Sequence, residues 1–143
     1  VSSIAIDGDK VWFGGDKGVT LYSESTHDWI HFTTEDGLPS NRITCIAVEQ
    51  PPTPVAEFAK NSGKGDGEDV WFGTFDAGVA RYSKTNKTWK TLTKEDGLAH
   101  NGILSIAADG DNVWIGTQRG LSRYNKHTDT WTVYTQHHGS EDI

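Results

Sequence analysis

The sequence predicts an all-β protein made of three four-stranded antiparallel β-propeller blades, and three observations lead to this prediction. All six tryptophans occupy two positions of a repeated unit, with a spacing of 43 residues between Trp71 and Trp114. A period near 43 is typical of propeller blades. The chain also contains 16 glycines, which suits a protein with many turns, and no segment outside one candidate insertion has the periodicity of a helix. The tryptophans are Trp12, Trp71 and Trp114 in a Val-Trp-[Phe/Ile]-Gly motif, followed by Trp29, Trp89 and Trp131.

Each copy of the unit divides into four short strands. Residues 1–7, 43–49 and 103–109 are rich in β-branched and small residues and predict the first strand of each blade. The tryptophan motif predicts the second strand, and "GVTLY", "GVARY" and "GLSRY" after a glycine-containing turn predict the third. A polar turn then leads to the fourth strand, "WIHFT", "WKTLT" or "WTVYT". Strands of about five residues joined by turn residues predict antiparallel meanders.

These strands give three predicted units along the chain. Blade 1 spans residues 1–42, blade 2 spans residues 43–102, and blade 3 with a tail spans residues 103–143. Blade 2 is longer because of an insertion at about residues 50–69, which holds three of the four prolines and the run "NSGKGDGED". This composition predicts a mobile surface loop, and "PVAEFAKN" within it is the weak helical candidate.

The charge of the chain excludes several functions. The net charge is -7, the isoelectric point is about 5.2, and lysines and arginines are scattered singly. This pattern argues against nucleic acids and acidic membranes as partners. No apolar run approaches the roughly 18 residues of a spanning helix, so we expect no membrane insertion by this segment. Cys45 is the single cysteine, which excludes an intrachain disulfide or a cysteine-based metal site.

Catalytic and metal chemistry have weak support in the sequence. His27 and His31 would lie on one side of a strand, but the other copies carry no histidine there, so we expect no metal site and no cofactor. Asp36 and Asp96 recur in Glu-Asp-Gly-Leu, where aspartate and glycine favour a turn rather than a catalytic carboxylate pair. No Ser-His-Asp constellation is evident, and His100 is the single modest candidate for a general base. We therefore expect no catalytic residues and no enzyme, with a lyase-like activity as the least favoured alternative.

The repeat also resembles a known family. The segments "EDGLPSNRITCIAVE" and "VWFGTFDAGVARY" are similar to the two-component regulator propeller repeat of bacterial hybrid two-component proteins. The resemblance extends from Val1 to about Gly139 as three tandem repeats, although the third Asp-Gly-Leu position reads His138-Gly139-Ser140. It implies a periplasmic or extracellular location and a non-catalytic module for ligand sensing or protein interaction. A small molecule or a carbohydrate is the ligand class that the resemblance suggests.

Ligand recognition by such blades is expected on the loops at one end of the channel. If the first strands line the axis, the loops between blades and the turns between second and third strands open on the same face. Polar or aromatic residues that differ between copies are the candidates there, against the alternative that they are solvated turn residues. The candidates are Asn41, Arg42, Phe75, Asp76, His100, Asn101, Gln118 and Arg119.

Three blades are too few to close a propeller, because propellers usually contain four to eight. Further blades outside this sequence would complete the ring, or two copies of the chain would form a six-bladed ring. An open filament is a third arrangement, since a head-to-tail contact that fails to close produces a fibre. A structural, self-assembling repeat protein is therefore the alternative to the sensor function.

Overall fold

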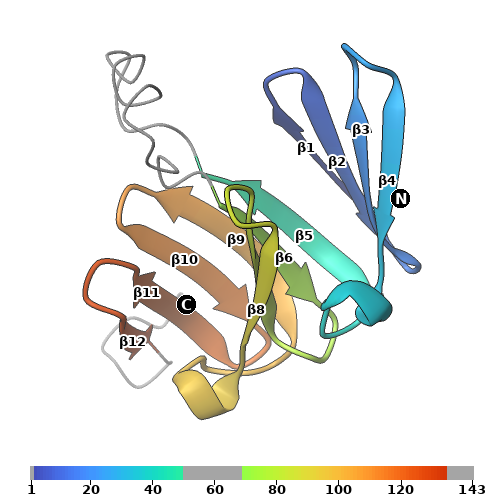
Figure 1. Cartoon of the computed structure of the whole chain (residues 1–143). Helices are drawn as coiled ribbons and strands as arrows, with labels where there is room; N and C mark the ends of the chain where they lie inside the picture. The colour runs from blue at the N-terminus through green and yellow to red at the C-terminus, as the bar shows by residue number, and fades with distance from the viewer. Residues whose placement is uncertain (1, 50–68, 135–143) are drawn as a thin grey trace.

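The computed structural model describes residues 2–49 and 69–134, which form three four-stranded antiparallel sheets that do not close into a ring (Figure 1). Within each sheet the strands follow the chain order, so each sheet is a meander. The prediction of an all-β fold is confirmed. The strands are β1 (Ser3–Asp7), β2 (Lys10–Gly15), β3 (Gly18–Ser23), β4 (Asp28–Phe32), β5 (Ile43–Val48), β6 (Val70–Thr74), β7 (Val79–Ser83), β8 (Thr88–Leu92), β9 (Ile103–Asp109), β10 (Asn112–Thr117), β11 (Gly120–Asn125) and β12 (Thr130–Tyr134).

Some sequence predictions fall on residues outside the described ranges. The insertion predicted at about residues 50–69 is described at Asp69 alone, and the third Asp-Gly-Leu position at 138–140 is not described. The helical candidate "PVAEFAKN" also lies outside the described residues. Among the residues that are described, no helix has the length and apolar character needed to cross a bilayer.

The polar segment between the third and fourth strands of each sheet forms a turn that includes one residue with a positive φ. His27, Lys87 and Asp129 occupy equivalent positions there and have φ of 61°, 56° and 56°. A left-handed residue at this point reverses the chain, and the polar composition of these turns lowers the cost of that conformation.

Short 3-10 turns connect the sheets at Thr34–Asp36 and Lys94–Asp96. Thr33 caps the first turn, and Oδ2 of Asp36 accepts a 2.9 Å hydrogen bond from the Thr33 amide. Asp96 makes the same 2.9 Å contact with Thr93. The structural role predicted for both aspartates is therefore confirmed, because each completes a capping box.

Neighbouring sheets pack face to face around two apolar cores. Trp12 is fully buried between the first and second sheets, with its ring centroid 5.4 Å from that of Phe72 and 5.7 Å from that of Tyr82. Trp71 is buried in the same way against Tyr124 of the third sheet, at 6.0 Å. The repeated tryptophan of the second strand is thus the centre of each described contact between sheets.

The outer tryptophan of the first sheet differs from its counterparts. Trp89 and Trp131 pack on the preceding sheet, whereas Trp29 is 65% exposed. Trp29 is uncovered because no described sheet lies on that side of β1–β4. Ile4 and Ile6 of β1 are 60% and 69% exposed, so the first sheet presents an uncovered apolar face.

The first strands of the three sheets, β1, β5 and β9, lie beside one another at the inner side of the arc (Figure 1). Two hydroxyl groups join them. Ser2 Oγ donates to the Ile43 carbonyl over 2.7 Å, and Thr44 Oγ1 donates to the Ile103 carbonyl over 2.7 Å. Leu104 occupies the same repeat position in β9, has no hydroxyl, and is 59% exposed. The first strands thus occupy equivalent positions in the three sheets, but the residues at the position of these hydroxyl donors differ.

Candidate functional site

The loops between sheets and the turns after the second strands meet at one edge of the molecule. The Gly18 amide donates to the Asn41 carbonyl over 2.7 Å, and the Gly78 amide donates to the Asn101 carbonyl over 2.9 Å. Each hydrogen bond connects the turn of one sheet with the loop that leads to the next sheet. The candidate residues therefore lie on a single edge, which we call the loop edge.

Asn41 and Asn101 stabilise the loops of the loop edge through side-chain hydrogen bonds. Their Oδ1 atoms accept 2.9 Å hydrogen bonds from the amides of Thr34 and Lys94, at the start of each 3-10 turn. Both side chains are half-buried. Their carboxamide oxygens thus hold the loops in place, as an asparagine side chain commonly does in a turn.

Arg42 and Phe75 form a pair on the loop edge of the second sheet. The guanidinium carbon of Arg42 lies 4.1 Å above the centre of the Phe75 ring, and the Phe75 amide donates to the Arg42 carbonyl over 3.0 Å. Phe75 is 44% exposed, and Asp76 beside it is also exposed. A cation stacked on an accessible ring offers both an apolar surface and a positive charge to a ligand.

His100 and Arg119 line a shallow hollow on the loop edge of the third sheet, together with Lys94 and Ala99. The His100 Nδ1 atom accepts a 2.9 Å hydrogen bond from the Gly102 amide, which fixes the ring and places the proton of the neutral form on Nε2. Two cationic side chains and a donor nitrogen therefore surround this hollow. Such a group suits an anionic or acceptor-rich ligand.

Gln118 and Arg119 follow β10, where the chain turns into β11. The Gln118 amide donates to the Gly102 carbonyl over 3.0 Å, and the Arg119 amide donates to Thr117 Oγ1 over 3.1 Å. Both side chains are exposed. Among the described residues, no hydrogen bond or ring contact joins the Arg42–Phe75 pair to the His100 hollow, so the loop edge holds two separate clusters.

Two of the described histidines outside the loop edge contact neighbouring side chains through Nδ1. His27 Nδ1 lies 3.1 Å from the Tyr22 hydroxyl, and His31 Nδ1 lies 2.9 Å from Thr20 Oγ1. Over residues 2–49 and 69–134, no group of three or more His, Cys, Asp or Glu side chains is placed to hold a metal. Burial raises the pKa of the half-buried Cys45 thiol, which lowers its reactivity.

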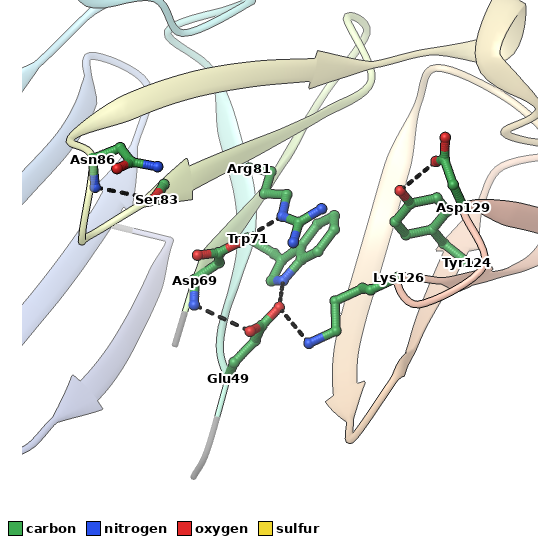
Figure 2. Close-up of polar contacts among 9 residues, drawn as sticks. All are labelled: Glu49, Asp69, Trp71, Arg81, Ser83, Asn86, Tyr124, Lys126 and Asp129. Carbon is green, nitrogen blue, oxygen red and sulfur yellow. Dashed lines mark hydrogen bonds and ion pairs between the residues drawn. The ribbon is translucent and has the colours of Figure 1, made fainter. Parts of the chain in front are cut away.

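Sequence reasoning did not find a polar cluster between the second and third sheets (Figure 2). Glu49 is 3% exposed, and its Oε2 atom accepts a 2.7 Å hydrogen bond from Trp71 Nε1 and lies 2.9 Å from Lys126 Nζ. Its Oε1 atom accepts a 3.1 Å hydrogen bond from the Asp69 amide. The signal for this cluster was an acidic residue at the end of each first strand and a lysine after two of the third strands.

The same contact carries a second ion pair. Arg81 Nε lies 2.6 Å from Asp69 Oδ2, and the Arg81 guanidinium lies 5.0 Å from the centre of the Trp71 ring (Figure 2). The Tyr124 hydroxyl donates to Asp129 Oδ1 over 2.6 Å. Two ion pairs therefore lie beside Trp71 at the contact between the second and third sheets, next to the apolar core.

Comparison with known proteins finds similarity between parts of this chain and two-component system proteins. Residues 97–119 match the family model described as "Two component regulator propeller". A 58-residue segment is 38% identical to a protein named histidine kinase P4 of Formosa agariphila, covering 37% of this chain and 4% of that protein. The resemblance to two-component regulator propeller repeats, inferred from the repeated motifs, is thus confirmed.

Solved structures from B. thetaiotaomicron share the fold. One, described as the extracellular domain of a hybrid two component system, has a TM-score of 0.72 and 20% identity over 95% of this chain. Another, described as the extracellular domain of a one component system, has a TM-score of 0.69 and 24% identity over 92% of this chain. This chain spans 18% and 16% of those two structures, so it corresponds to a small part of each.

Proposed function

We propose that this chain supplies three blades of a periplasmic or extracellular sensor propeller that recognises a ligand or a protein partner without catalysing a reaction. The matched family model, the similar histidine kinase and the extracellular domains that share the fold all support a role in signal transduction. The uncovered apolar face at Ile4, Ile6 and Trp29 supports the view that further blades complete the propeller.

The loop edge carries the recognition function in this proposal. The supporting observation is the pairing of rigid loops with exposed cationic and aromatic side chains, at Arg42–Phe75 and at His100–Arg119. Backbone hydrogen bonds already fix these loops, so little conformational entropy is lost when a ligand binds. The charges favour an anionic ligand, and an acidic oligosaccharide would use both the cations and the Phe75 ring.

A ligand screen tests this proposal. We expect acidic mono- and oligosaccharides, screened by thermal shift together with neutral sugars, to include a compound that raises the melting temperature of the chain. Calorimetric titration should then show at least about tenfold weaker binding in Arg42→Ala or Arg119→Ala. Lys17→Ala is the control, because this exposed residue takes the place of Arg119 in the turn of the first sheet and belongs to neither cluster. Equal affinity in all variants would refute the loop-edge site.

Self-assembly is the second candidate function, and the same uncovered apolar face favours it. Trp114 and Tyr134 of the third sheet stack at 6.2 Å, just as Trp12 and Phe32 do in the first sheet, where that pair packs against the second sheet. A second copy could therefore dock its first sheet on this pair. Light scattering would support this function by showing a discrete dimer with no response to any screened ligand.

A further inference from the structure

A groove runs between the first and second sheets, and none of the candidate residues of the loop edge lines it. It has a volume of about 480 Å³. Its floor is apolar, with Leu21, Ile30 and Phe32 from one sheet and Trp89 from the other. Lys10, Lys84 and Lys87 lie along it, together with Asp36. The groove therefore combines an apolar floor with several cations.

The matching position between the second and third sheets is occupied by charged side chains. Arg81 takes the place of Leu21, and Asp69 takes the place of Lys10, and these two form the 2.6 Å ion pair described above. Lys90 replaces Ile30 in the fourth strand. The groove thus arises from the particular residues of the first contact between sheets rather than from the repeat itself.

A buried hydrogen-bond donor lies beside the groove without an acceptor. Trp12 lines the groove and is fully buried, and its Nε1 atom has no hydrogen-bond partner among the described residues. In the next sheet, Trp71 Nε1 is satisfied by Glu49, a residue whose counterpart in the first sheet is Asp7. Asp7 is one methylene shorter and binds Lys84 at 2.7 Å instead. A buried donor without an acceptor is costly, so a bound oxygen atom here is favourable.

The charges around the groove favour a ligand that accepts hydrogen bonds. Lys10 has one weak partner, Asp9 at 3.7 Å, and both side chains are about half exposed. No ion-pair partner of Lys87 is found within residues 2–49 and 69–134. The acidic side chain on the groove, Asp36, already uses Oδ2 to cap its own turn. Donors therefore outnumber free acceptors, although Asp7 neutralises Lys84.

We propose that this groove binds a small aromatic carboxylate. The ring system lies on Leu21, Ile30 and Trp89, and covers the 49% of Ile30 that is exposed in the free protein. The negative charge lies near Lys10 and Lys87, and a carboxylate oxygen accepts from Trp12 Nε1 once the side chains that close this buried nitrogen off from the groove move aside. This site does not depend on the loop edge, so either proposal stands if the other fails.

Calorimetric titration with naphthalene-2-carboxylate tests the site on the full chain. We expect binding of one molecule per chain. Lys87→Gln should weaken binding by about tenfold, since it removes a cation while leaving the fold intact. Lys17→Gln is the matched control, an exposed lysine in another turn, and should bind as the unmodified chain does. Absence of binding by the unmodified chain, or equal binding by Lys87→Gln, would overturn the proposal.

A double variant should fill the groove with the ion pair that occupies the matching position between the second and third sheets. Lys10→Asp combined with Leu21→Arg recreates the ion pair of Asp69 and Arg81 at the first contact between sheets. This variant should lose binding of naphthalene-2-carboxylate while keeping its circular dichroism spectrum. Undiminished binding by the folded variant would place the probe elsewhere and overturn the proposal. If the double variant does not fold, the comparison of Lys87→Gln with Lys17→Gln decides.

Asp7→Glu tests the contact with Trp12. The longer side chain reaches as far as Glu49 does in the next sheet, so its carboxylate competes with the ligand for Trp12 Nε1. We expect weaker binding in Asp7→Glu than in the unmodified chain. Unchanged affinity would overturn the placement of the carboxylate at Trp12.

Discussion

The indole nitrogen of Trp71 donates a 2.7 Å hydrogen bond to Oε2 of Glu49, at the contact between the second and third sheets. Lys126 neutralises the same oxygen at 2.9 Å, so this buried carboxylate joins strands of two sheets. A buried carboxylate of this kind is tolerated when all its partners are present, and removing one partner lowers the free energy of unfolding. The difference from the first contact, where Asp7 binds Lys84 alone, leads to the first prediction.

Glu49→Ala should destabilise the chain by about 3 kcal/mol, because it leaves the Lys126 charge and the Trp71 donor without their acceptor. Asp7→Ala should cost less, about 1 kcal/mol, since Asp7 and Lys84 are 18% and 25% exposed and no indole depends on them. Urea unfolding of both variants measures the difference. Equal losses would contradict the role assigned to Glu49.

Gly97→Ala should destabilise the contact between the second and third sheets by about 2 kcal/mol. Gly97 has a φ of 127°, and an added Cβ would lie 2.6 Å from Cδ1 of Trp131. Gly110→Ala is the control, because Gly110 also has a positive φ, 60°, but has nothing within 4 Å of an added Cβ. Thermal unfolding should show a smaller loss for Gly110→Ala, of about 1 kcal/mol, and the reverse order would refute the packing argument.

Stability should fall as the pH rises from 10 to 12, and Tyr124 should contribute to this fall. Burial and the hydrogen bond to Asp129 raise the pKa of Tyr124 from 10.0 to about 12. The folded state therefore holds this proton more tightly than the unfolded state, and the stabilisation is complete below pH 10 and is lost toward pH 12. Tyr124→Phe should flatten the pH dependence of urea unfolding, with a residual slope from Tyr82, whose pKa burial also raises. An unchanged slope would contradict this assignment.

The uncovered face of the first sheet should make the chain self-associate as its concentration rises. Ile4 and Trp29 are 60% and 65% exposed, and the equivalent Trp89 is packed against a neighbouring sheet. Combining Ile4→Lys with Trp29→Lys should suppress association, because the charges oppose burial of that face. Light scattering across a concentration series measures the mass. A monomer at every concentration would show that the face does not associate.

The strands could be predicted from the sequence because the tryptophan spacing, the turn residues and the strand composition all agreed. Aspartate and glycine in Glu-Asp-Gly-Leu likewise predicted the turns at Asp36 and Asp96, since those residues act through local backbone geometry. Such local features can be predicted without knowing which sheets become neighbours. The exposure of Trp29 could not be read in this way, because burial depends on whether another sheet covers it.

Contacts between repeats were harder to predict than the repeats. The loop edge was expected from the order of strands, but the stacking of Arg42 on Phe75 depends on side-chain positions in two different loops. The Glu49 cluster requires an alignment of acidic and lysine positions across three sheets and a judgement about burial. Differences between the copies, rather than their shared motif, therefore carry the information about sites.

The differing contacts between sheets also bear on how a chain of near-identical repeats avoids misassembly. Ser2 and Thr44 donate to the carbonyl of the following first strand, whereas Leu104 cannot, and charged residues fill one contact where apolar residues line the other. A sheet placed beside the wrong neighbour would bury an unpaired charge or lose a hydroxyl donor. Each sheet therefore packs more favourably against its own neighbour than against another repeat. This difference opposes domain swapping between repeats and favours their correct order during folding.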